Sequence, residues 1–417
     1  MRILKLTGAV ESRLLAMRAR RDIHAEKVAA RIIADVRRRG DAALFSWTRK
    51  LDSIDLARRG VWISHREIEK ARENVSPDFL RAVKHSMANV RKVAEKQLPR
   101  EWSMEVEPGV RIGQMVRAIE SVGCYIPGGT STLLSTLVMT AVPAQVAGAT
   151  RIVAVCSRPN NELLATAGLL GVSEVARIGG AQAISALAYG TKAIPRVAKI
   201  CGPGNRFVTA AKQLVSRDCA IDLPAGPTEA IVMASQGNAS WIAADLLAQA
   251  EHAPDAGSIL VTTSAQLARD VGREVAEQLK KLPEGNPART SLKNTGAILL
   301  AASVDAAFSF MNRFAPEHLS LPQSGAATLE KISAAGTVFI GPWAAQPLGD
   351  YASGSNHVLP TGEWANRRGG LSAADFVKCI SVQTIDRKGF RRLAADVRAL
   401  AQAENLFAHE NAVAVRG

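Results

Sequence analysis

The amino-acid sequence predicts an α/β fold with two parallel sheets, preceded by helices and followed by a C-terminal helical segment. Two features of composition favour it: aromatic residues are sparse at 5%, and Ala, Leu, Val and Ile carry most of the 47% hydrophobic content. The third feature is the alternation of short apolar runs with helical patterns, which is typical of helices covering a buried parallel sheet. A length of 417 residues is enough for two to three domains.

The first 118 residues are expected to be mainly helical. Within residues 22–39, apolar side chains recur at helical spacing and form one stripe, at Ile23, Val28, Ile32 and Val36. Further helices are expected over residues 42–50 and 77–96. This segment shows no chemistry of its own, so we interpret it as scaffold.

From residue 119 onward, each short apolar run is followed by a helical pattern. Strands are expected at residues 122–126, 151–156, 175–178 and 199–201. This order predicts a doubly wound, incomplete Rossmann-like sheet with right-handed crossovers. Three of the strands end in glycine-rich turns, at Gly128-Gly129, Gly179-Gly180 and Gly202-Pro-Gly204. All three turns would lie at the carboxyl edge of the sheet, where such sheets bind ligands.

A standard dinucleotide fingerprint is absent from these turns. The run Gly202-Pro-Gly204-Asn-Arg-Phe207 begins like the fingerprint but has Phe where the third Gly belongs, and Asp222 is only a loose candidate for the acidic residue that should follow. Two interpretations therefore stay open. The glycines serve a nucleotide, or they only permit tight turns between strand and helix.

A second α/β unit follows, with strands expected at residues 230–234, 259–263, 297–301 and 337–340. Residues 341–359 and 361–370 are expected to be loops, and the tail from about residue 372 to be helical. The predicted organisation has four parts. They are an N-terminal arm (1–22), a first α/β domain (23–118 with 229–370), a second α/β domain (119–228) and a C-terminal helical arm (371–417).

Cysteine usage and hydropathy indicate a reduced, cytoplasmic protein. The five cysteines are scattered and form no Cys-x-x-Cys pair, so neither a disulfide framework nor a cysteine zinc site is expected. The N-terminus lacks the apolar core of a secretory signal. The longest apolar stretch, residues 131–148, is interrupted by Pro143 and Gln145, so no membrane partner is expected.

The net charge of +14 is concentrated in the N-terminal quarter. Residues 1–100 hold 24 Lys and Arg against 12 Asp and Glu. These charges are spread along the outer faces of amphipathic helices, which is the usual pattern of a solvated surface. We therefore expect no nucleic-acid partner.

Glu317 and His318 follow Pro316, and they are the strongest candidates for catalysis in the sequence. Glu and His are the side chains most often used as general acid and base, and the proline fixes the loop that carries them. Other histidines also stand near acids or amides: His252 near Gln249, His357 near Asp350, and His409 near Glu404. Each histidine taken alone could equally be structural.

Gln249 and His252 are spaced i,i+3 at the end of a helix expected over residues 240–251, so both could reach one metal ion. Together with Asp350 and His409 they offer oxygen and imidazole ligands, which suit zinc or manganese in an incompletely filled catalytic site. Only the Gln249/His252 pair has support from spacing. The residues alone indicate an α/β enzyme, with its nucleotide and metal dependence left open.

Several longer segments resemble the histidinol dehydrogenase family and occur in the family's order over roughly residues 20–415. These segments are Gly-Cys-Tyr125-Ile-Pro-Gly-Gly, Gly-Gly-Ala-Gln182-Ala-Ile, Gly-Pro-Gly-Asn205, Asp-Leu-Pro-Ala-Gly-Pro-Thr228-Glu, Gln249-Ala-Glu-His252, Pro-Glu317-His318, Gly-Asp350-Tyr-Ala-Ser-Gly-Ser-Asn-His357-Val-Leu-Pro-Thr and Ala-Glu404-Asn-Leu-Phe-Ala-His409-Glu-Asn-Ala-Val. The resemblance implies oxidation of L-histidinol through L-histidinal to L-histidine, in histidine biosynthesis, with NAD and zinc (manganese being possible).

The resemblance also implies roles for single residues. The acid/base pair would be Glu317 and His318, and the cofactor contacts Tyr125, Gln182 and Asn205. The metal ligands would be Gln249, His252, Asp350 and His409. The substrate contacts would be Thr228, Gln249, His252, His318, Asp350, Glu404 and His409. The family further implies a homodimer whose C-terminal arm crosses to its partner, so that Glu404 and His409 would complete the other subunit's site.

Two segments depart from the family pattern. Thr228 stands where Ser is usual, and in residues 362–370 Asn366 and Arg367 replace an Arg and an aromatic residue. If that loop lines the pocket, the substrate could be another amino alcohol or a polyol. A third alternative is a catalytically idle basic binding protein, against which the intact Glu317-His318 pair and metal set argue.

Overall fold

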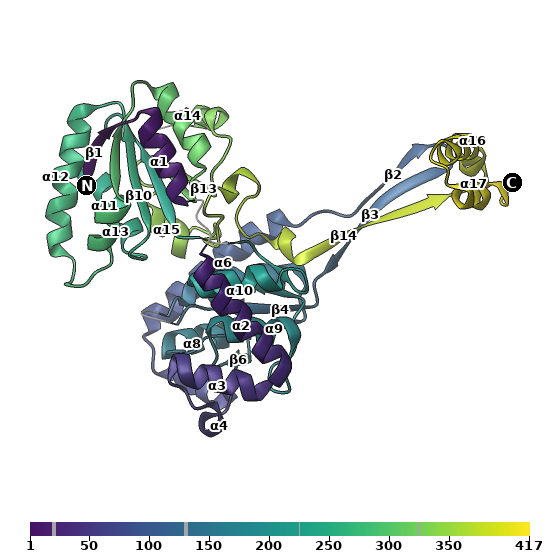
Figure 1. Ribbon diagram of the computed structural model, residues 1–417, viewed down its shortest axis with the longest axis horizontal. Helices are drawn as coiled ribbons and strands as arrows, with labels where there is room; N and C mark the ends of the chain where they lie inside the picture. Colours follow the sequence, from purple (N-terminus) through teal and green to yellow (C-terminus); the bar gives the residue numbers. More distant parts are fainter. Residues whose placement is uncertain (19–21, 129–131, 225, 324–325) are drawn as a thin grey trace.

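Two parallel sheets and a projecting antiparallel arm make up the architecture (Figure 1). The structure is a computed structural model, and it describes residues 1–18, 22–128, 132–224, 226–323 and 326–417. Gly129, part of the first predicted glycine-rich turn, lies outside these residues. The predicted α/β class with two doubly wound units is confirmed.

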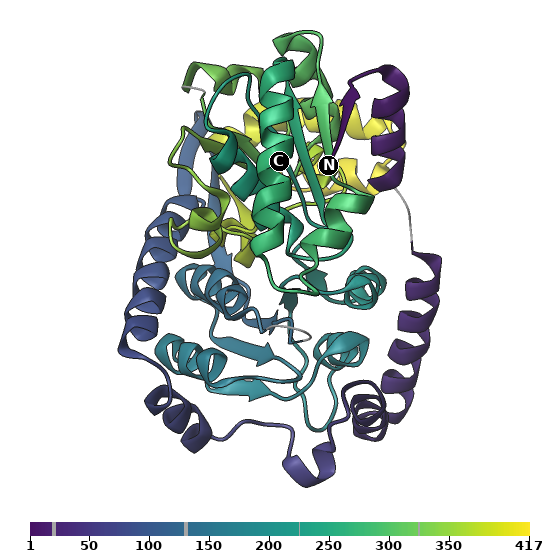
Figure 2. The same ribbon diagram turned by 90° about the vertical axis from the view of Figure 1, so that its left-hand side faces the viewer.

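The first sheet has six parallel strands in the order β1-β11-β10-β9-β12-β13. The strands are β1 (Arg2–Lys5), β9 (Glu229–Met233), β10 (Gly257–Thr262), β11 (Ala297–Leu300), β12 (His318–Leu321) and β13 (Thr337–Ile340). Helices α1 (Gly8–Arg18) and α14 (Val304–Phe314) pack on one face. Helices α11 (Ala239–Ala250), α12 (Ala265–Lys281) and α13 (Ala288–Asn294) cover the other (Figure 2).

The second sheet has five parallel strands in the order β6-β5-β4-β7-β8. They are β4 (Ser121–Tyr125), β5 (Arg151–Val155), β6 (Glu174–Ala176), β7 (Lys199–Cys201) and β8 (Ala220–Ile221). One face is covered by α2 (Ile23–Arg39), α3 (Asp41–Asp52), α4 (Leu56–Arg59), α9 (Gly180–Tyr189) and α10 (Arg206–Val215). The other is covered by α5 (His65–Glu73), α6 (Pro77–Gln97), α7 (Leu134–Ala147) and α8 (Asn161–Leu170).

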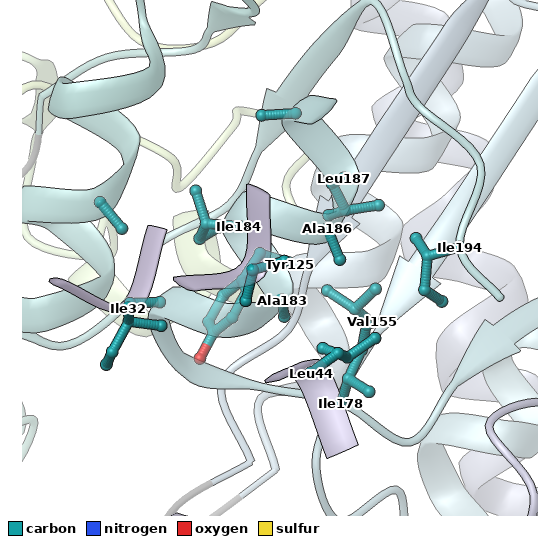
Figure 3. Packing of buried hydrophobic residues seen from close by; sticks show 14 of the residues in the cluster. Ile32, Leu44, Tyr125, Val155, Ile178, Ala183, Ile184, Ala186, Leu187 and Ile194 are labelled. Atoms are coloured by element: carbon teal, nitrogen blue, oxygen red, sulfur yellow. The ribbon is translucent and has the colours of Figure 1, made fainter. Parts of the chain in front are cut away.

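The predicted grouping of residues 23–118 with 229–370 differs from the packing. Ile32 and Leu44 of the N-terminal helices share one core with Ile184 and Tyr125, so these helices belong to the five-stranded sheet (Figure 3). Within the predicted apolar stripe of α2, Ile32 and Val36 are buried and Val28 is partly buried, whereas Ile23 is exposed. An apolar stripe does not show which surface the helix packs on. In the structure, that surface is formed by α9 and α10.

The N-terminal segment is also not a free arm. Strand β1 pairs with β11 in parallel, and Leu14 of α1 packs with the apolar face of the six-stranded sheet. The region expected to be mainly helical therefore contributes a strand to the lobe formed by residues 229–340.

The arm is a three-stranded antiparallel sheet in the order β14-β3-β2, and α16 and α17 form its tip. Its elements are β2 (Trp102–Glu107), β3 (Val110–Ala118), β14 (Val377–Ile385), α16 (Arg387–Ala403) and α17 (Phe407–Ala414). The arm extends away from both lobes (Figure 1). The tail expected to be helical from about residue 372 thus has a short 3-10 helix at Ala373–Phe376 followed by a nine-residue strand, and β2 and β3 lie within the first 118 residues, which were expected to be mainly helical.

No helix among the described residues is long and apolar enough to cross a membrane.

Candidate active site

Glu317 and His318 lie where α14 gives way to β12. Helix α14 ends at Phe314, Ala315 takes the left-handed conformation at φ 48°, and β12 begins at His318. Glu317 is buried, and its Oε2 accepts hydrogen bonds from the Glu229 backbone N–H (3.0 Å) and the Thr228 hydroxyl (2.5 Å). The carboxylate is therefore fixed by the chain entering β9, the strand next to β12.

The His318 imidazole is held between two carboxylates. Its Nδ1 lies 3.7 Å from Glu317 Oε2 and its Nε2 lies 3.6 Å from Asp350 Oδ1, while the ring stacks on Phe339 with centroids 6.1 Å apart. At these distances neither nitrogen makes a hydrogen bond, and both are buried without a partner among the described residues. Buried polar atoms without partners are rare in folded proteins, and a catalytic role is one explanation for them.

Burial and the neighbouring charges shift the pKa values of Glu317, His318 and Asp350. Burial raises the pKa of Glu317 above its usual value. Burial also acts to lower the pKa of His318, but the Glu317 and Asp350 carboxylates outweigh it, so that the pKa is raised. Burial acts to raise the pKa of Asp350, yet the neighbouring His318 brings it below its ordinary value. The three groups therefore titrate as a coupled set.

Gln249 and His252 lie beside this set, at the end of α11. The Gln249 amide donates from Nε2 to the Thr228 hydroxyl (2.9 Å), and its Oε1 accepts from Gln346 Nε2 (2.7 Å). His252 Nδ1 lies 2.9 Å from the Ala248 carbonyl oxygen, so Nδ1 donates and Nε2 is left free as an acceptor or ligand.

These side chains have the donor chemistry that a divalent cation needs. Gln249 offers an amide oxygen, His252 a ring nitrogen and Asp350 a carboxylate. A histidine that binds a metal through one ring nitrogen usually donates a hydrogen bond from the other, as His252 Nδ1 does to the Ala248 carbonyl. Within the described part of the chain, however, no three His, Cys, Asp or Glu side chains form a metal site. Gln249 is linked through Gln346 to α15 (Gln346–Tyr351), the helix that carries Asp350, and the role of Gln249, His252 and Asp350 as ligands stays a prediction.

Glu404 and His409 do not join the site within one chain. Glu404 caps the C-terminus of α16 and His409 lies in α17, both exposed at the tip of the arm (Figure 1). The candidate substrate contacts and the fourth candidate ligand on this segment are therefore far from His318.

Tyr125, Gln182 and Asn205 all lie at the carboxyl edge of the five-stranded sheet, following β4, β6 and β7. The Tyr125 hydroxyl accepts from the Gly180 N–H (3.1 Å), and Gln182 donates to Asp52 Oδ2 (3.0 Å). Asn205 is exposed and caps α10 by accepting from the Phe207 and Val208 N–H groups. Gln182 Oε1 is buried and has no hydrogen-bond partner in the described residues.

The turn at Gly202 needs glycine for a physical reason. Its φ is +116°, and a Cβ there would lie 2.1 Å from the Tyr125 carbonyl oxygen. Asp222, the loose candidate for a ribose contact, holds this turn instead. It accepts from the Gly202 N–H (2.7 Å) and pairs with Lys212, and both side chains are buried. Asp222 is therefore structural.

His357 connects the two sheet edges, a role that the sequence did not reveal. Its Nδ1 donates to the Asp350 carbonyl (2.9 Å), and its Nε2 lies 3.4 Å from the Thr136 hydroxyl in the first turn of α7. Burial lowers the pKa of His357 and favours the neutral ring. Because α7 starts at the carboxyl edge of the five-stranded sheet, Asp350 is brought against the edge that carries Tyr125.

The divergent segment at residues 362–370 contacts the site through its backbone. The Gly362 N–H donates to Glu229 Oε1 (3.1 Å), whereas the side chains of Asn366 and Arg367 are exposed and Arg367 lies over the Trp364 ring at 4.9 Å. In one chain, the two substituted side chains are therefore not partners of the Glu317-His318 pair.

The fold and the site together define an α/β enzyme that holds the buried Glu317-His318 pair at one sheet edge and glycine-rich turns at the facing edge. The family model for histidinol dehydrogenase matches residues 16–417. The chain is 43% identical over 399 residues to the histidinol dehydrogenase of Methanosarcina barkeri, covering 94% of this chain and 91% of that protein. It is 44% identical over 388 residues to that of Methanothermobacter thermautotrophicus, covering 91% and 90%.

A solved structure agrees with the sequence relatives. The crystal structure of histidinol dehydrogenase from Elizabethkingia anophelis superposes with a TM-score of 0.93 at 35% identity, covering 100% of this chain and 98% of that one. The chain belongs to the histidinol dehydrogenase family. This family catalyses the NAD-dependent oxidation of histidinol to histidine in histidine biosynthesis, so the predicted oxidoreductase is confirmed.

Proposed function

We propose that this chain oxidises L-histidinol through L-histidinal to L-histidine with NAD and a divalent metal, and that it does so as a homodimer with exchanged arms. The observation that carries the proposal is the buried His318, whose two ring nitrogens lack partners between Glu317 and Asp350. An imidazole in this setting is suited to take a proton from a substrate hydroxyl near neutral pH.

The two lobes would divide the work. Glu317, His318 and the candidate ligands lie at the lobe of the six-stranded sheet, while Tyr125, Gln182 and Asn205 would contact NAD at the carboxyl edge of the five-stranded sheet. When bound, NAD accepts a hydride in each of two oxidations, and zinc or manganese, held by Gln249, His252, Asp350 and His409, polarises and orients the substrate.

His318 and Glu317 would move the protons. His318 takes the hydroxyl proton of L-histidinol as the adjacent carbon is oxidised to the aldehyde. Glu317 then takes a proton from water, whose oxygen adds to the aldehyde carbon and gives the hydrate. After His318 has released its first proton to solvent, it takes a proton from the hydrate in the second oxidation, in which the hydride passes to NAD, and the carboxylic acid that forms ionises to the carboxylate. Thr228 and the Glu229 N–H keep the Glu317 carboxylate aimed during these steps.

Arm exchange would complete the site. Glu404 and His409 are exposed at an arm that leaves both lobes, and the arm also exposes large apolar side chains, among them Trp102, Met104, Leu400 and Phe407. Exposed apolar surface of this extent is typical of a subunit interface. The arm of a second subunit would place its own Glu404 and His409 at this chain's Asp350. All five cysteines are free thiols, which suits the cytoplasm.

The test is NADH formation from L-histidinol by metal-replete protein, with a chelator control and product analysis. We expect two NADH for each histidine formed, loss of turnover with chelator and recovery with zinc. A folded, metal-loaded dimer that turns over other amino alcohols or polyols but not L-histidinol would contradict the substrate assignment.

A further inference from the structure

Arg18 forms a buried ion pair outside the residues assigned above. It is the last residue of α1, and its guanidinium pairs with both carboxylate oxygens of Glu229, with Nε to Oε2 at 2.6 Å. The two side chains are 8% and 6% exposed. A two-point pair of this kind fixes the relative orientation of its partners as well as their distance.

The same guanidinium also holds the chain that leads into Glu317. It donates to the carbonyl oxygens of Phe314 and Ala315, the latter at 3.3 Å, and it stacks over the Phe314 ring at 3.7 Å. Ala315 is the left-handed residue that turns the chain from α14 toward β12. Arg18, on helix α1, therefore holds this turn in place through its hydrogen bonds to the two carbonyl oxygens.

Glu229 carries the effect to the carboxylate of Glu317. Its backbone N–H donates to Glu317 Oε2 (3.0 Å), and its own Oε1 accepts from the Gly362 N–H (3.1 Å). We propose that Arg18 and Glu229 act as positioning residues, which hold Glu317 and the Ala315–Glu317 turn in the geometry for proton transfer. This inference rests on the proposed function for its kinetic part only.

A buried ion pair is weak evidence of stabilisation, because replacing both partners by neutral side chains of similar size is often tolerated. Its more specific use is to fix one arrangement of the chain, and here four oxygen atoms, two from the Glu229 carboxylate and two from backbone carbonyls, surround one guanidinium. If the pair only stabilised the fold, variants that keep the fold would keep full turnover.

Arg313 and Glu11 supply a matched control. They join the same two helices, α14 and α1, with Arg313 Nη2 at 2.8 Å from Glu11 Oε2, and within the described residues neither side chain forms a hydrogen bond or ion pair with residues 315–318. Arg313→Met therefore removes a pair that links α1 to α14 while it leaves the turn and the Glu229 N–H untouched.

The experiment compares the wild type with three single variants, Arg18→Lys, Arg18→Ala and Arg313→Met. It also includes one double variant, which combines Arg18→Met and Glu229→Gln. The double variant removes both charges, so no buried charge is left unpaired and folding is preserved, as its melting curve would show. We expect its kcat with L-histidinol to fall about 10- to 100-fold, because a small misplacement of a catalytic group has an effect of that order. The KM for L-histidinol should stay near the wild-type value.

Methylguanidinium should restore part of the Arg18→Ala turnover, and methylammonium should not, since only the planar cation can bridge Glu229 and the two carbonyl groups. A folded double variant with the kcat of Arg313→Met would overturn the proposal, as would equal rescue by both cations.

Amide hydrogen exchange gives a readout that needs no turnover. The Glu229 and Thr337 N–H groups, which bond to the Glu317 side chain and backbone, should exchange faster in the double variant and not in Arg313→Met. Unchanged exchange would refute the positioning role. If the wild type did not oxidise L-histidinol at all, but exchange was still faster in the double variant than in Arg313→Met, only the proposed substrate would be refuted.

Discussion

The proposed chemistry depends on His318, because both of its ring nitrogens are buried without a hydrogen-bond partner among the described residues. The sequence identified the Glu317-His318 pair from its residue types and the proline before it, and the family resemblance then gave the roles. Neither source could show that Thr228 and the Glu229 N–H hold the carboxylate, since those contacts join segments 88 and 89 residues apart.

Glu317→Gln tests the division of labour between the two residues. The amide keeps the size of the side chain but cannot take a proton from water, so we expect histidine formation to fall about 100-fold or more. His318 still serves the first oxidation, so aldehyde should accumulate and be captured by semicarbazide, as judged by mass spectrometry. Histidine formation at the wild-type rate would contradict the assignment of Glu317 to the hydration step.

Asp245 on α11 makes the stability of the fold depend on pH. Burial raises its pKa from 3.8 to about 6, so between these values the folded state binds more protons than the unfolded state. The contribution of Asp245 to stability is therefore greatest below pH 3.8, its ordinary pKa, and it is lost as the pH rises through about 6. Asp245→Asn should raise the melting temperature at pH 8 and leave it unchanged near pH 3, with a gain of up to about 3 kcal/mol.

Asp270→Asn on α12 serves as the comparison for Asp245. The hydrogen bonds from Gln266 and Arg273 lower the pKa of Asp270, so its contribution is present at neutral pH and is lost as pH falls. The Asp270 variant should thus lose stability at pH 8, the opposite sign from Asp245→Asn. Equal responses of the two variants would contradict the burial argument.

At the scale of elements, strands followed by glycine-rich turns were predictable, because short apolar runs and glycine mark them locally. All eight strands expected in the two parallel sheets occur, and β4 and β7 carry the predicted turns at one edge. The strands of the arm were not predictable in the same way. Strands β3 and β14 pair across more than 250 residues, and their exposed faces lack the apolar runs of a buried sheet.

Gly202→Ala tests the turn at the edge of the five-stranded sheet that is proposed to bind NAD. A methyl group at this position would collide with the Tyr125 carbonyl oxygen, so β4 and β7 would have to separate. We expect a loss of about 3 kcal/mol or more in stability, combining left-handed strain and overpacking. NAD binding, followed by quenching of protein fluorescence, should weaken at least 10-fold, a loss of about 1.4 kcal/mol.

Gly171→Ala is the control for this variant. Gly171 also has a positive φ, at +70°, but a Cβ there meets nothing within 4 Å. Its substitution should lower stability by about 1 kcal/mol through backbone strain alone and leave NAD affinity unchanged. If the two variants behaved alike, the close approach of Gly202 to Tyr125 would have no role in the site.

At the scale of the whole molecule, sequence patterns could not predict which helices cover which sheet or how the two sheets meet. Amphipathic spacing predicted the helix α2 but did not show that it covers the five-stranded sheet, because an apolar stripe does not specify the surface on which it packs. The meeting of the two sheet edges likewise depends on single contacts such as His357 with Thr136. Such contacts carry no periodic signal.

The arm gives a prediction about the assembly. If arms are exchanged, each site combines one subunit's His318 with His409 of its partner. His318→Asn and His409→Asn should then both be inactive as pure proteins, because each dimer has the same defect in both sites. In a mixed dimer, one site carries both substitutions and the other carries none, so that one site is restored.

Refolding the two variants together in equal amounts therefore decides between arms that cross and arms that fold back on their own chain. Random pairing makes half of the dimers mixed, each with one intact site, so we expect about a quarter of the wild-type NADH formation from L-histidinol. Without exchange, every site carries one of the two substitutions and activity stays at the level of the single variants. A mixture of the His318→Asn variant with a double variant lacking both histidines controls for refolding, since it contains no intact site in either arrangement.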